Sequence, residues 1–207
     1  MSRKELTDLL IKYGKKIGEK NMSPGTSGNL SCRYNEKILI TASGSANGDL
    51  SEDEILLMDF DGNKLDDTSK KLSSEKFLHI EIYKHRLDVN VVLHVHSPYL
   101  SSFAAAHIPL DKPIMAENTF YFGDIPIADY ALPSSIELAQ NTVKCLKNRN
   151  AALMANHGFV IVSDNIKDAY QKLEIAESYA QVVLNTYLLG GAKTLNQQQV
   201  DEIIKLK

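Results

Sequence analysis

The spacing of apolar residues predicts long amphipathic helices near both ends of the chain. Leu6, Leu10, Tyr13 and Ile17 recur at three- and four-residue steps, which is typical of one helix face. A similar stripe runs through 166–187 and should stop at the following glycine pair. A short helix is expected over 197–206. Both ends of the chain should therefore be helical.

Three further helices are predicted by their start signals. Ser73-Ser74-Glu75 precedes an apolar-periodic segment, so a serine cap is expected there. Pro98 can open a helix directly after an apolar run. Ser134-Ser135-Ile136-Glu137 has the pattern of a capping box and predicts a helix that continues to Leu146.

Short apolar runs between these helices predict strands. Runs at 30–34 and 37–41 flank Asn35-Glu36, which suggests a hairpin. A strand at 55–60 should be followed by a turn at Asp61-Gly62 and a short return through 63–65. Further strands are expected at 91–95, 151–155 and 159–162. Helices and hairpins in this irregular order predict an α/β fold with a largely antiparallel sheet. We expect a single domain over residues 1–207.

Composition narrows the classes of function. The 207 residues are 43% hydrophobic and 24% charged with a net charge of −3, which are globular values and give no basic footprint for a nucleic acid. No apolar run reaches 18 residues, so no membrane span is expected. Cys32 and Cys145 form no CxxC pair. They indicate buried thiols in a reducing, cytoplasmic setting.

Three histidines form the sharpest chemical pattern. His94 and His96 lie two apart in a predicted strand, so their rings should project to the same face. His157 precedes Gly158 between two predicted strands and should project from a turn. Three imidazoles suit Zn²⁺ or another late divalent ion and leave a coordination position open. Solvated or core histidines, or a structural zinc site, are the alternatives.

Polar turn segments predict an anion site near a carboxylate. Thr26 to Asn29, Ser43-Gly44 and Ser73-Ser74 combine hydroxyls, glycine-freed amides and a helix start, which can bind a phosphate without basic residues. Ordinary turn chemistry is the better explanation of each segment taken alone. Glu75 is the candidate fourth group beside the histidines, whereas His79 is expected to pack or form hydrogen bonds rather than bind metal.

Taken together, five segments resemble the class II aldolase/adducin family, which includes sugar-phosphate aldolases and epimerases. They occur in the family's order and at its approximate spacing: 25–31 (GTSGNLS), 39–44 (LITASG), 73–75 (SSE) with His79, 92–97 (VLHVHS) and 155–158 (ANHG). The resemblance implies a single three-layer αβα domain with a mainly antiparallel central sheet. It also implies a homotetramer with sites at subunit interfaces.

The resemblance also assigns roles. It implies Zn²⁺, with Mn²⁺ or Co²⁺ as alternatives, held by His94, His96 and His157, and Glu75 as the acid/base. A phosphate cradle is implied at Thr26, Asn29, Ser43, Gly44, Ser73 and Ser74. The function implied is zinc-dependent aldol cleavage of a small phosphorylated keto-sugar through a metal-stabilised enediolate.

Departures from the family pattern keep alternatives open. The tyrosine acid of the family's aldolases has no clear counterpart here, and Tyr121 or Glu117 are the substitutes considered. Where the epimerases carry an aspartate, this chain has Thr119, which weakens an epimerase interpretation. Dehydratase or decarboxylase chemistry on the same metal core stays open, as does a non-enzymatic adducin-like module, against which the retained histidines argue.

Overall fold

Seven strands form one sheet in the computed structural model, which describes residues 1–206. Their order across the sheet is β3-β2-β1-β4-β7-β6-β5, and every neighbouring pair is antiparallel except β5 and β6. The strands are β1 (Asn29–Tyr34), β2 (Lys37–Thr41), β3 (Ile55–Met58), β4 (Val91–Val95), β5 (Ile127–Ala128), β6 (Ala151–Met154) and β7 (Gly158–Ser163). The predicted α/β class and the largely antiparallel sheet are confirmed.

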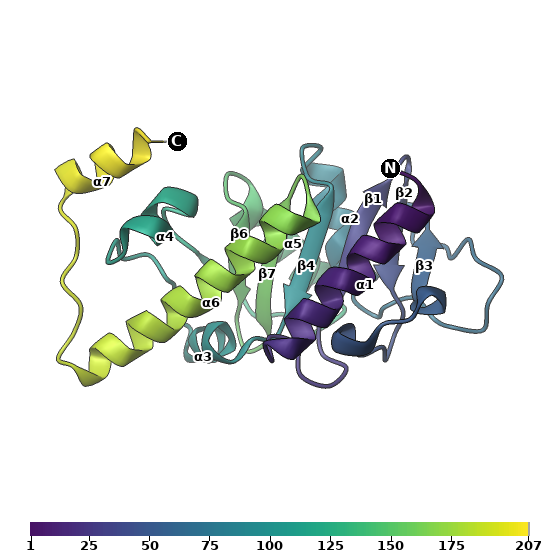
Figure 1. The fold of residues 1–207 in the computed structure, drawn as a ribbon, viewed down its shortest axis with the longest axis horizontal. Helices are drawn as coiled ribbons and strands as arrows, with labels where there is room; N and C mark the ends of the chain where they lie inside the picture. Colours follow the sequence, from purple (N-terminus) through teal and green to yellow (C-terminus); the bar gives the residue numbers. More distant parts are fainter. Residues whose placement is uncertain (207) are drawn as a thin grey trace.

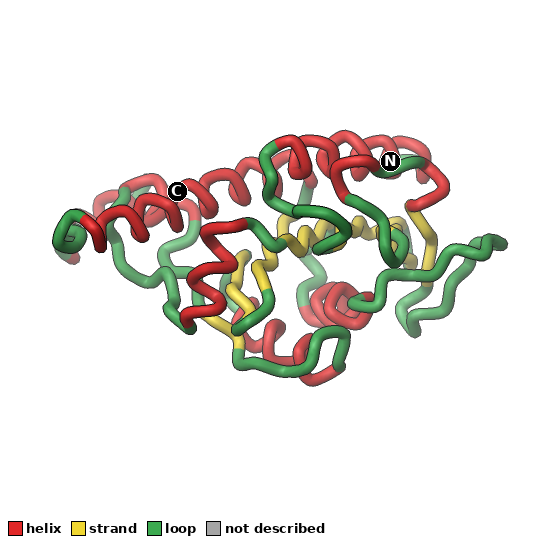
Figure 2. Tube along the Cα trace, turned by 90° about the horizontal axis from the view of Figure 1, so that it is seen from below, coloured by secondary structure: helices red, strands yellow, loops and turns green. Residues whose placement is uncertain are grey.

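Helices cover both faces of this sheet and make three layers (Figures 1 and 2). One face packs against α1 (Arg3–Glu19), α3 (Pro98–Ala106) and α6 (Ile166–Leu188), and the other against α2 (Lys76–His85) and α5 (Ile136–Leu146). Beyond one end of the sheet, α4 (Ala116–Tyr121) contacts α7 (Gln197–Ile204). Short 3₁₀ turns occupy Asn47–Asp49 and Glu52–Glu54.

Alternation along β4 decides which side chains reach which layer. Leu93 and its odd-numbered neighbours enter the core under α1, α3 and α6, whereas Val92 enters the core under α2 and α5. Because successive strand residues point to opposite faces, His94 shares the face of Val92. The central strand therefore directs an imidazole toward the layer that contains α2.

Several predicted boundaries were wrong. Glu75, not a serine, occupies the N-cap position of α2, and it makes no side-chain cap. Ser135 caps α5 by accepting from the Leu138 amide, so the capping box predicted to begin at Ser134 does not form. The strand predicted to end at residue 60 ends at Met58, and the return segment is reduced to one bridge with Lys64. The sequence also did not predict the short elements α4 and β5.

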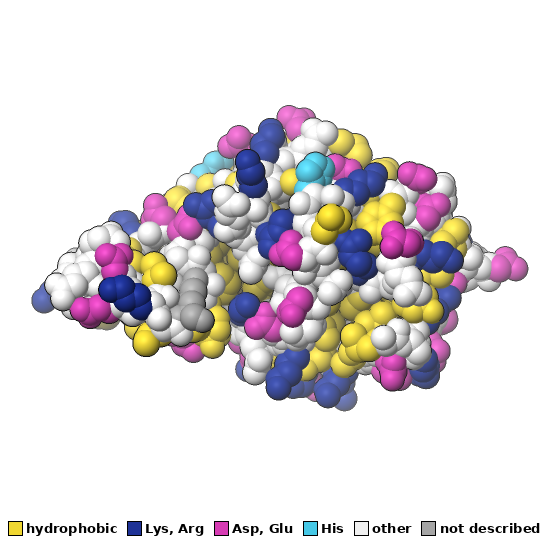
Figure 3. Space-filling view, turned by 90° about the horizontal axis from the view of Figure 1, so that it is seen from above, with side chains coloured by type: hydrophobic (Ala, Val, Ile, Leu, Met, Phe, Trp, Pro, Cys, Tyr) yellow, Lys and Arg dark blue, Asp and Glu magenta, His cyan; other side chains and the backbone are white. Residues whose placement is uncertain are grey.

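The surface mixes the two signs of charge. On the face shown in Figure 3, Lys and Arg side chains are interspersed with Asp and Glu side chains. Fields of opposite sign largely cancel in such an arrangement. Within residues 1–206, no helix combines the length and apolar character needed to cross a membrane.

Candidate active site

Strand pairing brings the three histidines together. His94 lies one residue before the end of β4, where it pairs with Val160 of β7, and His96 directly follows this strand. His157 lies in the turn that joins β6 to β7. One nitrogen from each of His94, His96 and His157 lies within 4.8 Å of the others. The ring centroids are 4.8 to 5.0 Å apart. The predicted same-face geometry of His94 and His96 is thus observed, and the turn adds the third ring.

The orientation of His94 is fixed by a backbone carbonyl. Its Nδ1 lies 3.0 Å from the carbonyl oxygen of Phe159, and the ring is fully buried. A carbonyl can only accept, so Nδ1–H donates and the Nε2 lone pair points into the cluster. That Nε2 lies 3.0 Å from Nε2 of His96. Burial, reinforced by the neighbouring His94 and His157, lowers the pKa of His96 to about 4.

Glu75 completes the cluster from the start of α2. Its Oε2 lies 3.0 Å from His94 Nε2, and its Oε1 lies 3.2 Å from His157 Nε2. Burial opposes ionisation of this carboxyl, but the imidazoles of His94 and His157 outweigh burial and hold its pKa below the usual range. Glu75 is therefore a buried carboxylate in contact with two of the three rings.

The donor set fits a divalent cation. Within residues 1–206, the buried Oε1 of Glu75 has no hydrogen-bond partner. A buried charged oxygen without a partner is costly, and a cation among the imidazole nitrogens would offset that cost. Three neutral imidazoles and a nearby carboxylate are ligands that late divalent metals accept while keeping a position for substrate.

Gly158 permits the close approach of these rings. A Cβ at this position would lie 2.7 Å from the Val95 carbonyl oxygen, 2.8 Å from His96 Cδ2 and 3.2 Å from His94 Cε1. Since the first atom is backbone, the clash cannot be relieved by a side-chain rotation.

We therefore expect Gly158→Ala to destabilise the fold by about 1–3 kcal/mol and to weaken metal binding. An alanine normally stabilises a strand relative to glycine, so a loss of stability in Gly158→Ala would indicate the predicted clash. Denaturant unfolding with and without added metal measures both consequences. A variant as stable as wild type would contradict the packing described here.

A polar cavity of about 200 Å³ opens beside the cluster. Glu75, His96 and His157 line it, whereas His94 lies fully buried behind them. All six residues predicted for the phosphate cradle also line it: Thr26, Asn29, Ser43, Gly44, Ser73 and Ser74. The residues described as its lining include no lysine or arginine. Anion binding here would depend on hydroxyls, amides and the N-terminus of α2.

Comparison with known proteins identifies the family. Residues 8–184 match the family described as the Class II Aldolase and Adducin N-terminal domain. The chain belongs to this family. It is 34% identical over 179 residues to an L-fuculose phosphate aldolase of Methanocaldococcus jannaschii, with 86% of this chain and 96% of that relative covered.

Two further relatives share the aldolase description. A 5-deoxy-D-ribulose 1-phosphate aldolase of Bacillus thuringiensis serovar kurstaki is 28% identical, with 95% and 92% of the two chains covered. A solved structure of L-fuculose 1-phosphate aldolase superposes with a TM-score of 0.92 at 29% identity, covering 100% of this chain and 97% of the other. Class II aldolases depend on a metal ion, and the histidine cluster is the candidate centre in this member.

The candidate site also contains residues that the sequence analysis did not predict to lie in it. Pro133 and Ser134 line the cavity, and Ser134 adopts a left-handed conformation with a φ of 69°. The Pro-Ser-Ser sequence was a turn signal, but it was interpreted as a helix cap. Glu117 and Tyr121 do not line this cavity; they border a separate one with residues of α6. Within one chain they are therefore not placed beside Glu75.

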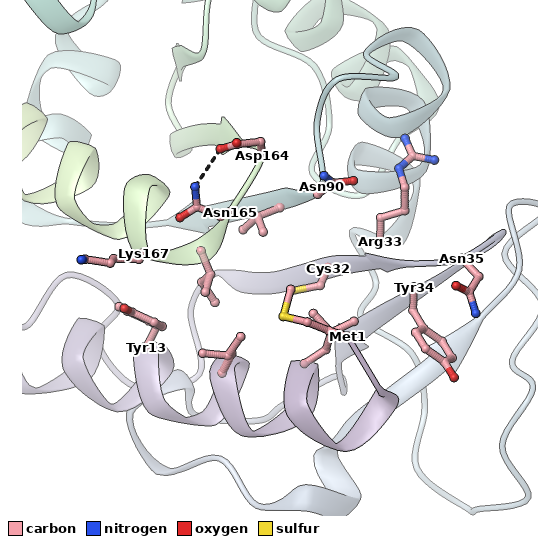
Figure 4. Close-up of a pocket in the computed structure, with 14 residues that line it drawn as sticks. Met1, Tyr13, Cys32, Arg33, Tyr34, Asn35, Asn90, Asp164, Asn165 and Lys167 are labelled. Atoms are coloured by element: carbon pink, nitrogen blue, oxygen red, sulfur yellow. Dashed lines mark hydrogen bonds between the residues drawn. The ribbon is translucent and has the colours of Figure 1, made fainter.

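A second cavity lies at the opposite end of β1 (Figure 4). It encloses about 480 Å³ between α1 and the sheet, and Tyr13, Tyr34 and Cys32 contribute to its walls. Burial raises the pKa of the Cys32 thiol to about 12, so this cysteine is protonated and unreactive near neutral pH. No part of this cavity includes the histidine cluster.

Proposed function

We propose that this class II aldolase family member is a zinc-dependent aldolase that cleaves a ketose 1-phosphate. The observation that carries the proposal is the convergence of three imidazoles and Glu75 beside a polar cavity suited to a phosphate. The names of the relatives, which specify L-fuculose phosphate and 5-deoxy-D-ribulose 1-phosphate, support this substrate class.

His94, His96 and His157 are the proposed ligands of Zn²⁺, and Mn²⁺ or Co²⁺ are alternative ions. A divalent ion bound there would act as a Lewis acid that stabilises the negative charge developing on the substrate carbonyl oxygen. Because the imidazole rings are neutral, an ion bound by them would keep its full positive charge. The Phe159 carbonyl keeps the His94 lone pair directed into the cluster, where His94 would bind the ion.

Glu75 is the proposed proton carrier. In cleavage, the C4 hydroxyl loses its proton, the C3–C4 bond breaks, C4 becomes an aldehyde, and the electron pair left on C3 takes up a proton. The products are dihydroxyacetone phosphate and an aldehyde. We assign the proton at C3 to Glu75, which removes it in the direction of synthesis and returns it in the direction of cleavage.

The phosphate is proposed to bind opposite the histidines. Thr26, Ser43 and Ser74 have hydroxyls that form no hydrogen bond to any other residue of 1–206. Gly44 and Ser73 also line the cavity, and Ser73 lies just before the N-terminus of α2, whose partial positive charge favours an anion. Asn29 retains one amide hydrogen for this purpose.

Replacing both serines, Ser73→Ala/Ser74→Ala, should raise KM for the phosphorylated sugar about 10- to 100-fold, because two hydrogen bonds to a charged group are lost. Metal content should not change. Ser69→Ala is the matched control, because Ser69 is exposed and does not line the cavity. Unchanged KM in the double variant would place the phosphate elsewhere.

The substrate class is tested by turnover of L-fuculose 1-phosphate, 5-deoxy-D-ribulose 1-phosphate and the corresponding unphosphorylated sugars with Zn²⁺ present. The proposal expects cleavage of at least one phosphorylated sugar and much weaker activity on its unphosphorylated form. A protein that binds these sugars without turning them over would instead be a binding module.

We also infer a cytoplasmic homotetramer, as the resemblance implies. Support comes from the last turns of α6, where Tyr187, Leu188 and Leu189 are exposed apolar side chains that assembly would cover. Sedimentation equilibrium of the purified protein tests the state of assembly, and a monomer at micromolar concentration would contradict it.

A further inference from the structure

A buried chain of hydrogen bonds leads from the core to Glu75. Tyr83 Oη lies 2.8 Å from Ser31 Oγ, which lies 2.6 Å from His79 Nδ1. His79 Nε2 contacts Asn29 Oδ1, and Asn29 Nδ2 lies 2.9 Å from Glu75 Oε2. Every member of this chain is buried, and three of them have no exposed surface. The alternation of β1 places Asn29 and Ser31 on the same face, toward α2.

The donor and acceptor of each hydrogen bond in this series are determined by Glu75, at its end. A carboxylate only accepts hydrogen bonds, so the amide nitrogen of Asn29 donates to Glu75 and its oxygen must accept from His79 Nε2–H. A neutral ring with hydrogen on Nε2 accepts at Nδ1, so Ser31 donates there and in turn accepts from the Tyr83 hydroxyl. Burial lowers the pKa of His79 to about 3, in agreement with a neutral ring.

This arrangement holds one oxygen of Glu75 by a hydrogen bond from Asn29 and leaves the other without a hydrogen bond. Oε2 is bonded to Asn29, whereas Oε1 has no hydrogen-bond partner and lies beside His157. A flipped Asn29 amide would place its oxygen against the carboxylate, and the His79 donor disfavours that state.

We propose that His79 is a positioning residue, which sets the amide orientation of Asn29 and thereby presents Oε1 of Glu75 to the substrate. This inference rests on the proposed function, in which Glu75 carries the C3 proton. Ser31 and Tyr83 contribute on the other side of the His79 ring, because their hydrogen bonds select the His79 tautomer that can donate to Asn29. Asn29 is then a support of the proton carrier as well as a wall of the cavity.

The test compares His79→Leu, which removes the donor, with His79→Gln, whose amide nitrogen can replace Nε2–H. We expect His79→Leu to lower kcat about 10- to 100-fold with KM and bound zinc near wild-type values, because a misplaced base loses rate rather than binding. His79→Gln should recover most of the rate. Thr142→Val removes an equally buried polar group on α5 and should leave kcat unchanged.

A double-variant cycle separates positioning from a general structural role. If His79 acts through Glu75, His79→Leu should have little effect on the residual rate of Glu75→Gln, measured as deuterium exchange at C3 of dihydroxyacetone phosphate. An equal fold-loss in both backgrounds, or no rescue by His79→Gln, would overturn the proposal.

Two further measurements keep the result decisive. If His79→Leu does not fold, Ser31→Ala serves as the test. It should lower kcat on its own, because His79 then loses the partner that selects its tautomer. Unchanged kcat in Ser31→Ala would overturn the inference. The proposed function fails separately if Glu75→Gln keeps the wild-type exchange rate. Loss of exchange in Glu75→Gln together with full kcat in His79→Leu rejects only the positioning role.

Discussion

Glu75→Gln should lower turnover by about 10²- to 10⁴-fold, because the amide keeps the shape of the side chain but cannot carry the proton. The three imidazoles remain, so bound metal should persist. The measurement is twofold: metal content of the purified variant, and exchange of the C3 proton of dihydroxyacetone phosphate with deuterated water.

Glu137→Gln is the matched control, because Glu137 lies at the start of a helix, as Glu75 does, but is exposed on α5. It should behave as wild type. Loss of metal from Glu75→Gln would make this carboxylate a required ligand, and exchange at the wild-type rate would assign the proton to another residue.

His94→Ala and His157→Ala should each weaken metal binding by more than about 100-fold and abolish cleavage. Loss of a residue that only hydrogen-bonds to a metal ligand already lowers metal affinity about 10- to 100-fold, and these variants remove a ligand itself. Elemental analysis gives the bound metal. The rise in Tm on adding metal, expected for wild type, should disappear in both variants.

His85→Ala is the control for histidine replacement, since His85 lies exposed at the end of α2 and its ring makes a hydrogen bond or ion pair only with Glu81 among the described residues. Its metal content should equal that of wild type. Metal bound at full stoichiometry by both His94→Ala and His157→Ala would reject the proposed ligand set.

The pattern of the sequence predicted the local geometry of the site well. The two-residue spacing of His94 and His96 specifies a shared face in an extended segment, although β4 ends between them at Val95. The turn predicted for His157 is observed, and Gly158 begins the strand that follows it. These are local consequences of backbone geometry. The strands themselves were predicted because their apolar runs are uninterrupted and end at turn residues.

Tertiary relations were not available from the same pattern. The pairing of β4 with β7 brings His157 to His94, and no local spacing encodes that neighbour. The hydrogen bonds of Asn29 to both Glu75 and His79 depend on β1 facing α2, so its supporting role was missed and only a phosphate contact was predicted. The elements β5 and α4 are too short to produce a recognisable period.

The most direct test of the account is identification of the products that the zinc-loaded protein forms from L-fuculose 1-phosphate and 5-deoxy-D-ribulose 1-phosphate. NMR of the reaction should show dihydroxyacetone phosphate and an aldehyde in equal amounts from at least one of them, and a chelator should abolish both signals. An isomeric ketose phosphate, a dehydrated sugar phosphate, or no reaction of the zinc-loaded protein with either compound would contradict the proposed aldol cleavage.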